Sequence, residues 1–338
     1  MSAPPGRLRS RARIDLGDYP VDAAWSADGK TLVVAGGEGS VLQVASSATQ
    51  PAVLLGLHRA GVLAVTWQKA GPLFASSGQD GVVMLWDART LTPKQIHEGA
   101  EWSEQLAFAD SGRWLAIAMG RTLQVHDETG ELRHRITEHA GAIAAVAWRP
   151  KRNELAVAGN NGARIHRLEP DLQSRDYPVR GACLTANWNA DGRMLACGMQ
   201  DGSIQLWNVA SATHSEIPGL GSRVFATEWS ANGRYLAAAA GETLALWDSD
   251  SKSAHGSAPV ELRGHSERLT ALRFRPSGPW LVSAARDRRL LLWRAGGPEQ
   301  PQDAHLLPDE CTLLRFSRDG ALLAAGDALG GLTIYECS

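Results

Sequence analysis

The sequence predicts an all-β protein in which one antiparallel four-stranded unit is repeated along the chain. Apolar runs that end in an aromatic residue recur at steps of 42, 41, 40, 40, 41, 45 and 42 residues. The eight aromatic positions are Trp25, Trp67, Phe108, Trp148, Trp188, Trp229, Phe274 and Phe316. Such a regular period indicates a repeat architecture, which can use 338 residues as one domain.

A second regularity is a set of four residues at fixed intervals. The intervals are 18, 4 and 6 residues in two separate copies. The copies are His58, Ser76, Asp80, Trp86 and His265, Ser283, Asp287, Trp293. A Gly-His start, an Asp in a hairpin and a closing Trp resemble the WD40 repeat. The resemblance implies a β-propeller, in which each of these two sets (a tetrad) forms a hydrogen-bonded chain across three strands of one blade.

Each unit is expected to contain a strand, a turn, a second strand, a hairpin and a third strand. The turns are rich in Asp, Asn and Gly, as in Ser26–Gly29, because these residues tolerate positive φ. The second strands contain Leu115-Ala116, Leu155-Ala156, Leu195-Ala196, Leu236-Ala237 and Leu323-Ala324. The third strands include Val83–Trp86, Ile204–Trp207, Leu244–Trp247, Leu290–Trp293 and Leu332–Tyr335.

Only units two and seven carry all four tetrad residues. Units three and six have hairpins one residue shorter and without Asp, at Met119–Thr122 and Ala240–Thr243, so apolar packing must hold them. In unit four, His139 is followed by Asn161 and Arg167 at the later tetrad positions. The polar stretch Ser249–Pro259 is expected to be a loop.

The spacing favours eight units over seven, within a single domain covering residues 1–338. The last unit ends after its third strand and lacks an outer strand of its own. Leu8–Leu16 alternates apolar residues with arginines, which indicates a strand with one packed face and one wet face. We expect this N-terminal strand to close the last blade and remove the open sheet edge.

Composition excludes several function classes. The formal net charge of −2 gives no reason to expect nucleic acid or an anionic membrane as a partner. No apolar run approaches the roughly 18 residues needed to span a bilayer. The four cysteines lack metal-ligand spacing, and no secretory signal is apparent, so we expect a cytoplasmic protein without cofactor or metal.

The sequence does not predict an enzyme. No phosphate-binding loop, zinc-binding helix motif or nucleophile elbow is present. His265, Ser283 and Asp287 are the residue types of a catalytic triad, but the same trio recurs in the second unit, so a structural role is favoured. The innermost strands are rich in alanine, which predicts a narrow, packed centre. A central-channel or loop-built catalytic site is kept as an alternative.

The resemblance implies that partners bind the propeller face that carries the hairpins between second and third strands. Two clusters of residue types typical of interfaces are expected there. The predicted partner-binding residues are Arg223, Arg268, Arg286, Trp102, Met119 and Arg121. We therefore expect a non-catalytic scaffold for a protein or peptide, with an acidic or phosphorylated segment suited to the arginines. Assembly through the blade sides is the second alternative.

Overall fold

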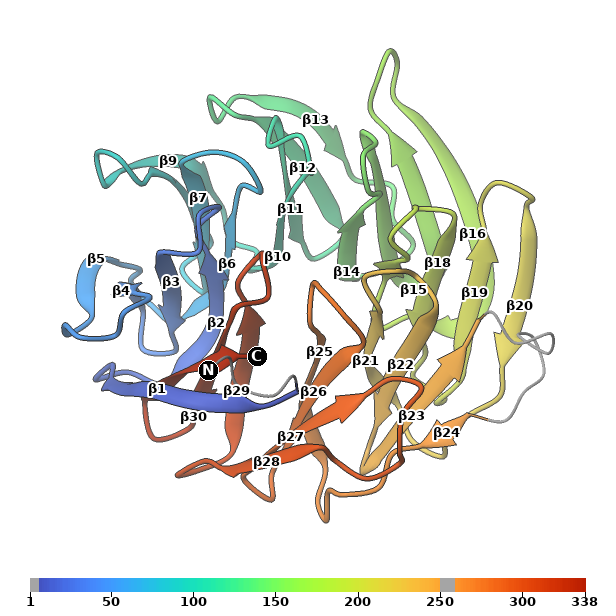
Figure 1. The fold of residues 1–338 in the computed structure, drawn as a ribbon. Coiled ribbons are helices and arrows are strands. Elements are labelled where there is room, and N and C mark those ends of the chain that lie inside the picture. The colour runs from blue at the N-terminus through green and yellow to red at the C-terminus, as the bar shows by residue number, and fades with distance from the viewer. Residues whose placement is uncertain (1–5, 250–258) are drawn as a thin grey trace.

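A computed structural model describes residues 6–249 and 259–338 and shows eight antiparallel sheets arranged in a ring (Figure 1). The predicted eight-bladed propeller is confirmed, and the seven-bladed alternative is wrong. No helix occurs among the described residues, so none of the described segments could cross a membrane as a helix. The loop predicted at Ser249–Pro259 lies almost entirely at 250–258, outside the described residues.

Within a blade, successive strands pair as neighbours from the channel outward. Blades one to four contain β2 (Pro20–Trp25), β3 (Thr31–Gly36), β4 (Ser40–Ala45), β5 (Val53–Leu57); β6 (Val62–Trp67), β7 (Leu73–Gly78), β8 (Val82–Asp87), β9 (Thr92–Glu98); β10 (Ser103–Phe108), β11 (Trp114–Met119), β12 (Thr122–Asp127), β13 (Leu132–Ile136); and β14 (Ile143–Trp148), β15 (Glu154–Arg167), β16 (Gln173–Ala182).

The remaining blades repeat this order. Blades five to eight contain β17 (Asn187–Trp188), β18 (Met194–Gly198), β19 (Ile204–Asn208), β20 (Thr213–Ile217); β21 (Val224–Trp229), β22 (Tyr235–Ala240), β23 (Thr243–Asp248), β24 (Val260–Glu261); β25 (Leu269–Phe274), β26 (Trp280–Ala285), β27 (Arg289–Arg294), β28 (Asp303–Leu306); and β29 (Cys311–Phe316), β30 (Leu322–Asp327), β31 (Gly331–Cys337) with β1 (Leu8–Asp15).

Blade four has one continuous strand where the others have two. The first half of β15 pairs with β14 and its second half pairs with β16. Between the halves the chain reverses at Asn161 and Gly162, whose φ angles are 68° and 119°. Positive φ at two adjacent residues suits a tight hairpin, so β15 supplies both the second and the third strand.

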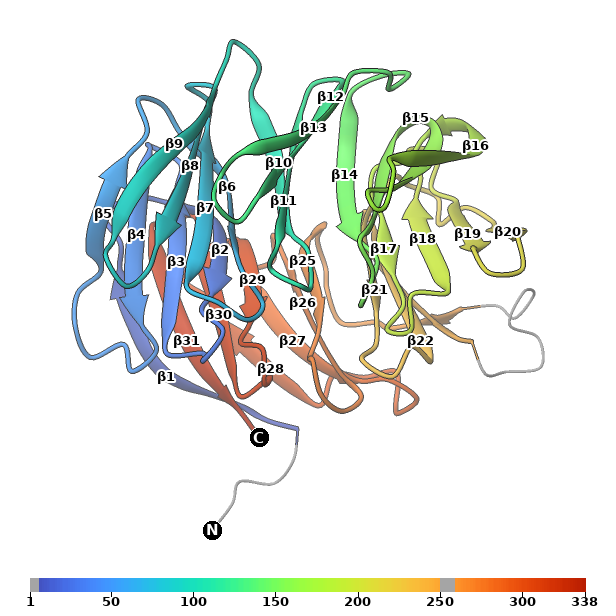
Figure 2. The same cartoon turned by 90° about the horizontal axis from the view of Figure 1, so that it is seen from above.

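The N-terminal strand closes the ring as predicted. β1 pairs antiparallel with β31, from Leu8 opposite Cys337 to Asp15 opposite Gly331 (Figures 1 and 2). Leu8 packs into the core between blades seven and eight, whereas Ile14 packs into the core between blades eight and one. The strand therefore joins the last blade to both of its neighbours while its arginines remain on the exposed face.

The strand-ending aromatic residues explain the repeat period. The indole N–H of Trp148 donates to Ala107 O at 2.8 Å, and that of Trp188 donates to Ala147 O at 3.0 Å. Each acceptor lies on the innermost strand of the preceding blade. Trp25 makes the same bond to Arg315 O across the ring closure, at 2.9 Å. These aromatics therefore fasten one blade to the next.

Candidate functional site

The two predicted tetrads form the same hydrogen-bonded chain in blades two and seven. In blade seven, Trp293 Nε1 donates to Ser283 Oγ at 2.8 Å. Ser283 Oγ lies 2.8 Å from His265 Nε2, and His265 Nδ1 lies 3.1 Å from Asp287. Blade two places His58, Ser76, Asp80 and Trp86 in the same arrangement. Asp287 also accepts the backbone N–H of Ser266, so it holds the loop before the inner strand.

The Ser-His-Asp geometry in these blades is structural. Ser283 is 0% exposed, so no substrate can reach its hydroxyl. That oxygen already accepts the indole N–H of Trp293, which leaves its proton for His265 Nε2. Burial acts to raise the pKa of Asp287, but hydrogen bonds from Ser266, Arg289 and His265 outweigh it, and the pKa lies below its ordinary value. The carboxylate is thus a fixed acceptor.

Blade four replaces the tetrad with a histidine pair. The expectation of Arg167 at the closing position is wrong, because the shorter hairpin places His166 there, with its Nε2 3.1 Å from His139 Nε2. His139 Nδ1 donates to Arg121 O, since a carbonyl can only accept, so its Nε2 must accept from His166. His166 Nδ1 then accepts the hydroxyl of Ser174. Burial lowers the pKa of His166 to about 3, which keeps it neutral at pH 7.

The candidate partner-binding surface is the loop face, defined by the residues before each first strand and the hairpins between second and third strands. In five blades a hairpin N–H donates to the carbonyl of the residue before the first strand, at 2.8–3.0 Å. The pairs are Gly37 to Tyr19, Gln79 to Gly61, Gln200 to Ala182, Arg286 to Arg268 and Ala328 to Glu310. These bonds fix both sets of residues at one end of each blade.

Three predicted arginines lie on this face in blades six and seven. Arg223 precedes β21, Arg268 precedes β25, and Arg286 lies in the hairpin after β26; all three are exposed. Arg286 forms an ion pair with Glu310, with Nε 3.2 Å from Oε2. Arg223 and Arg268 make no ion pair or side-chain hydrogen bond with any residue that the structure describes. Two positive groups are therefore available to a partner.

The blade-three cluster is only partly on the surface. Trp102 precedes β10 and is 53% exposed. Arg121 is exposed, but its Nε donates to His139 O at 2.9 Å, which ties the blade-three hairpin to the next loop. The expectation that Met119 is exposed is wrong, because Met119 is 3% exposed. The shortened hairpin makes Met119 the last residue of β11, with its side chain in the core.

Comparison with known proteins places these features in a family. The family model described as "WD domain, G-beta repeat" (WD40) matches residues 50–87, 173–208 and 256–294. The last of these segments contains the blade-seven tetrad from His265 to Trp293. The chain therefore contains WD40 repeats, as predicted.

Relatives of this chain cover most of its length. "Cell division cycle 20.1, cofactor of APC complex" from Arabidopsis thaliana is 26% identical over 320 residues, which are 89% of this chain and 60% of that protein. "WD repeat-containing protein slp1" from Schizosaccharomyces pombe is 23% identical over 301 residues, 87% of this chain and 53% of that protein. The chain thus spans little more than half the length of these relatives.

A solved structure shows the same fold. The computationally designed Ika8 protein superimposes with a TM-score of 0.78 at 19% identity, over 97% of this chain and 99% of that chain. At this level of identity the likeness concerns the propeller fold alone.

Two residues of the WD40 loop face were not selected from the sequence. Tyr19 precedes β2 and Leu329 lies in the hairpin before β31, and both are exposed. Their chain neighbours lie close together, because Asp18 O is 3.3 Å from the place where a Cβ of Gly330 would be. Tyr19 packs against Gly37, where a Cβ would lie 2.0 Å from Tyr19 Cζ. In the sequence, the glycine at position 37 was the feature that could have indicated room for the Tyr19 ring.

The centre of the propeller differs from the expectation. The prediction of a packed centre is wrong, because a channel of about 700 Å³ runs along the innermost strands and all eight blades line it. Alanine side chains are too short to fill the space inside a ring of eight blades. Among the residues that the structure describes, no group of three or more His, Cys, Asp or Glu is placed to hold a metal ion.

Proposed function

We propose that this protein is a non-catalytic adaptor that binds a protein or peptide partner through its loop face. The observation that carries the proposal is the gathering of exposed arginine and aromatic side chains on that face, where Arg223 and Arg268 have no ion-pair partner among the described residues. Arg, Trp and Tyr are the residues that dominate binding energy at protein interfaces. The burial of both Ser-His-Asp trios supports an adaptor over a hydrolase.

The relatives' names support the same class of function. Four of the Arabidopsis relatives carry the words "cofactor of APC complex", which describe proteins that act together with a protein assembly. This chain matches 38–60% of the length of these proteins, at 26% identity. A protein partner for this chain follows as part of the proposal, and the identity of that partner is left to experiment.

The proposed partner segment is acidic or phosphorylated and is followed by an apolar residue. Arg223, Arg268 and Arg286 occupy adjoining blades, and guanidinium groups bind carboxylates and phosphates through two parallel hydrogen bonds. Going round the ring, Leu329 and Tyr19 follow on blades eight and one. An extended segment crossing this arc would meet positive charge first and an apolar surface next.

The test is capture of partners from the native cell by wild-type protein and by the double variant Arg268→Glu, Arg286→Glu. Reversing two charges should abolish capture of the specific partner, and wild-type capture should weaken as salt concentration rises. Both arginines are exposed and the Arg286–Glu310 pair is a surface pair, so the free energy of unfolding should change by about 1 kcal/mol or less.

A matched control reverses two arginines away from the loop face. Arg9 and Arg135 lie exposed on outer strands β1 and β13. Arg9→Glu with Arg135→Glu makes the same charge change and should leave capture intact. Unchanged capture by the Arg268/Arg286 variant would reject the loop-face proposal, whereas equal loss in both variants would show a general charge effect.

A second candidate function is assembly through the blade sides. On the outer strand β5, Val53, Leu54 and Leu57 are each more than half exposed. β5 is also an edge strand with unpaired backbone groups, which favours association with another chain. Sedimentation of the wild type and of Leu54→Lys, Leu57→Lys distinguishes this role: it requires a larger particle that the lysines reduce to a single chain.

A further inference from the structure

The channel wall carries arginines on blades seven and eight and carboxylates on blades one, three and six (Asp22, Glu104 and Glu228). The residue just before the strand-ending aromatic lines the channel in six of the eight blades. On blades five to eight these residues are Asn187, Glu228, Arg273 and Arg315. Blades one to four have alanine or threonine there, beginning with Ala24 and Thr66. Three of these side chains bond to a neighbouring blade: Asn187 to Thr227 O, Arg273 to Glu228 and Arg315 to Asp22.

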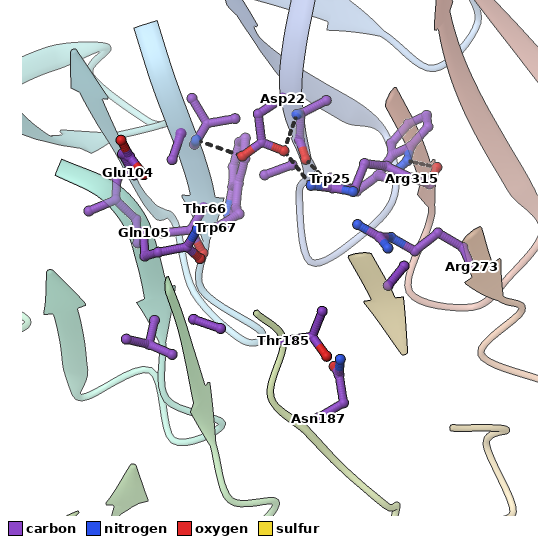
Figure 3. Close-up of a pocket in the computed structure, with 18 of the residues that line it drawn as sticks. Asp22, Trp25, Thr66, Trp67, Glu104, Gln105, Thr185, Asn187, Arg273 and Arg315 are labelled. Carbon is purple, nitrogen blue, oxygen red and sulfur yellow. Dashed lines mark hydrogen bonds and ion pairs between the residues drawn. The ribbon is translucent and has the colours of Figure 1, made fainter. Parts of the chain in front are cut away.

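Arg315 is fully anchored. Its Nε donates to Ala23 O at 3.1 Å, its Nη1 to Leu314 O at 2.9 Å and its Nη2 to Asp22 Oδ1 at 2.5 Å. Asp22 also accepts the backbone N–H of Val65 at 3.0 Å. Each of the three guanidinium nitrogens thus has a partner, and the side chain is held at a fixed position on the channel wall (Figure 3).

Arg273 lies next to Arg315 and is only half satisfied. Its Nη1 donates to Glu228 Oε1 at 2.9 Å and to Leu272 O at 2.7 Å. Its Nε and Nη2 have no hydrogen-bond partner among the described residues, and the side chain is 33% exposed. Figure 3 shows its guanidinium group extending into the channel. Three N–H bonds therefore point toward the cavity without an acceptor.

Arg273 and Arg315 are two like charges on adjoining blades of the channel wall. Burial lowers the pKa of Arg273, and the positive charge of Arg315 lowers it further, whereas Glu228 and Asp22 act to raise it. Burial raises the pKa of Glu228, and the positive charges of Arg273 and Arg315 oppose that shift. Lys69 and Arg318 also line the channel; Arg318 contacts Lys69 O, and the ammonium group of Lys69 is ion-paired with Asp110. An anion would relieve the repulsion between Arg273 and Arg315.

The channel also offers neutral polar groups. The side-chain amide of Gln105 and the hydroxyl of Thr66 line the cavity and have no partner among the described residues. The hydroxyl oxygens of Thr270 and Thr312 are buried without a hydrogen bond in a smaller adjoining cavity of about 180 Å³, which Arg273 and Arg315 also line. The amide of Gln105 and the hydroxyl of Thr66 are thus free to form hydrogen bonds with a ligand in the channel.

We propose that the central channel binds a small phosphorylated molecule, with its phosphate on Arg273 and Arg315 and a hydroxylated body toward Gln105 and Thr66. A phosphate monoester supplies several acceptor oxygens and about two negative charges, which match adjacent guanidinium groups. The channel volume of about 700 Å³ falls within the usual range for small-molecule sites. The site is separate from the loop face and does not depend on the adaptor function.

Isothermal titration calorimetry on the full chain tests the proposal, with glucose 6-phosphate as the probe. Glucose serves as the uncharged control, and citrate tests whether a carboxylate suffices. We expect glucose 6-phosphate to bind at one site and glucose not to bind. Arg273→Gln should weaken binding roughly tenfold or more, because it removes charge-assisted hydrogen bonds. Arg268→Gln, the same change on the loop face, should leave binding unchanged.

A second variant guards against misfolding. Arg273→Gln alone leaves Glu228 without its ion-pair partner, so the double variant Arg273→Gln, Glu228→Gln removes both charges, and circular dichroism checks its fold. Loss of binding in this folded variant supports the channel site. Wild-type affinity in the folded double variant, no heat with glucose 6-phosphate, or binding of citrate but not of glucose 6-phosphate would each overturn the proposal.

Discussion

Blades six and seven are neighbours, and each has a tryptophan near the end of its third strand. The two tryptophans differ in hydrogen bonding. Trp293 of blade seven donates its indole N–H to Ser283, whereas the buried indole N–H of Trp247 in blade six has no partner among the described residues. Ser283 lies opposite Leu291, two residues before Trp293. In blade six the corresponding position is Ala238, opposite Ala245. The difference between the blades is thus one hydroxyl group and the network behind it.

The comparison separates what forms a blade from what reinforces it. β22 of blade six is buried along its whole length and contains four consecutive alanines. It pairs with β23 in regular register and with β21 across one bulge, between Val224 and Ala226. Its hairpin is tied to blade seven instead, because Leu269 N donates to Gly241 O. Blade three has the same device, from Ile143 N to Gly120 O. Packing and backbone pairing therefore suffice for a blade, and the tetrad is an addition.

The largest expected effect is that of Ser283→Ala. This change converts blade seven to the blade-six residue and leaves both the Trp293 indole N–H and His265 Nε2 buried without a partner. Two orphaned groups should cost about 2–4 kcal/mol in the free energy of unfolding. Urea denaturation measures it. A loss below about 1 kcal/mol would mean that the network contributes no more than packing does.

The tryptophan pair gives the next largest effect. Trp293→Phe and Trp247→Phe remove similar buried ring volume, but only the first breaks a hydrogen bond, while the second also removes an unsatisfied donor. Trp293→Phe should therefore destabilise the protein by about 1–3 kcal/mol more than Trp247→Phe does. Thermal or urea unfolding of the two variants side by side gives this difference. Equal decreases in the free energy of unfolding would show that the hydrogen bond from the Trp293 indole contributes no stability.

The blades should also differ in acid sensitivity. Burial lowers the pKa of His265 below its ordinary value of 6.5, so the unfolded chain binds a proton first as the pH falls, and stability decreases. The lowered pKa of Asp287 acts in the same direction at lower pH.

Removing both titrating groups should make the free energy of unfolding depend less steeply on pH. His265→Gln with Asp287→Asn should be less stable at pH 7 but lose stability less steeply between pH 6.5 and 4.5, by up to about 1.4 kcal/mol per pH unit. Unfolding free energies measured across this range test it. Trp247→Phe is the control, and its slope should match that of the wild type; an identical slope in the blade-seven variant would contradict the assignment.

The fold could be predicted from the sequence more completely than the candidate site could. The spacing of aromatics and the alternation in Leu8–Leu16 predicted the blade count and the closing strand, because an aromatic residue ends the innermost strand of every unit. Met119 was misplaced because a hairpin shortened by one residue turns a surface position into the end of a strand. The charged channel wall was missed because Arg273 and Arg315 come together only in the closed ring.

The smallest expected effect, and the most direct transfer from one blade to the other, is that of Ala238→Ser. Ala238 is fully buried and occupies in blade six the place that Ser283 has in blade seven. A hydroxyl there would accept the indole N–H of Trp247 and add one buried hydrogen bond at little extra volume. With no histidine to take the hydroxyl proton, the gain should be about 0.5–1 kcal/mol in the free energy of unfolding.

Ala239→Ser is the matched control, since the adjacent side chain points to the opposite face of the sheet and cannot reach Trp247. A stabilisation by Ala238→Ser that Trp247→Phe abolishes would assign the gain to this bond, whereas equal destabilisation by both serines would show that blade six has no room for the network.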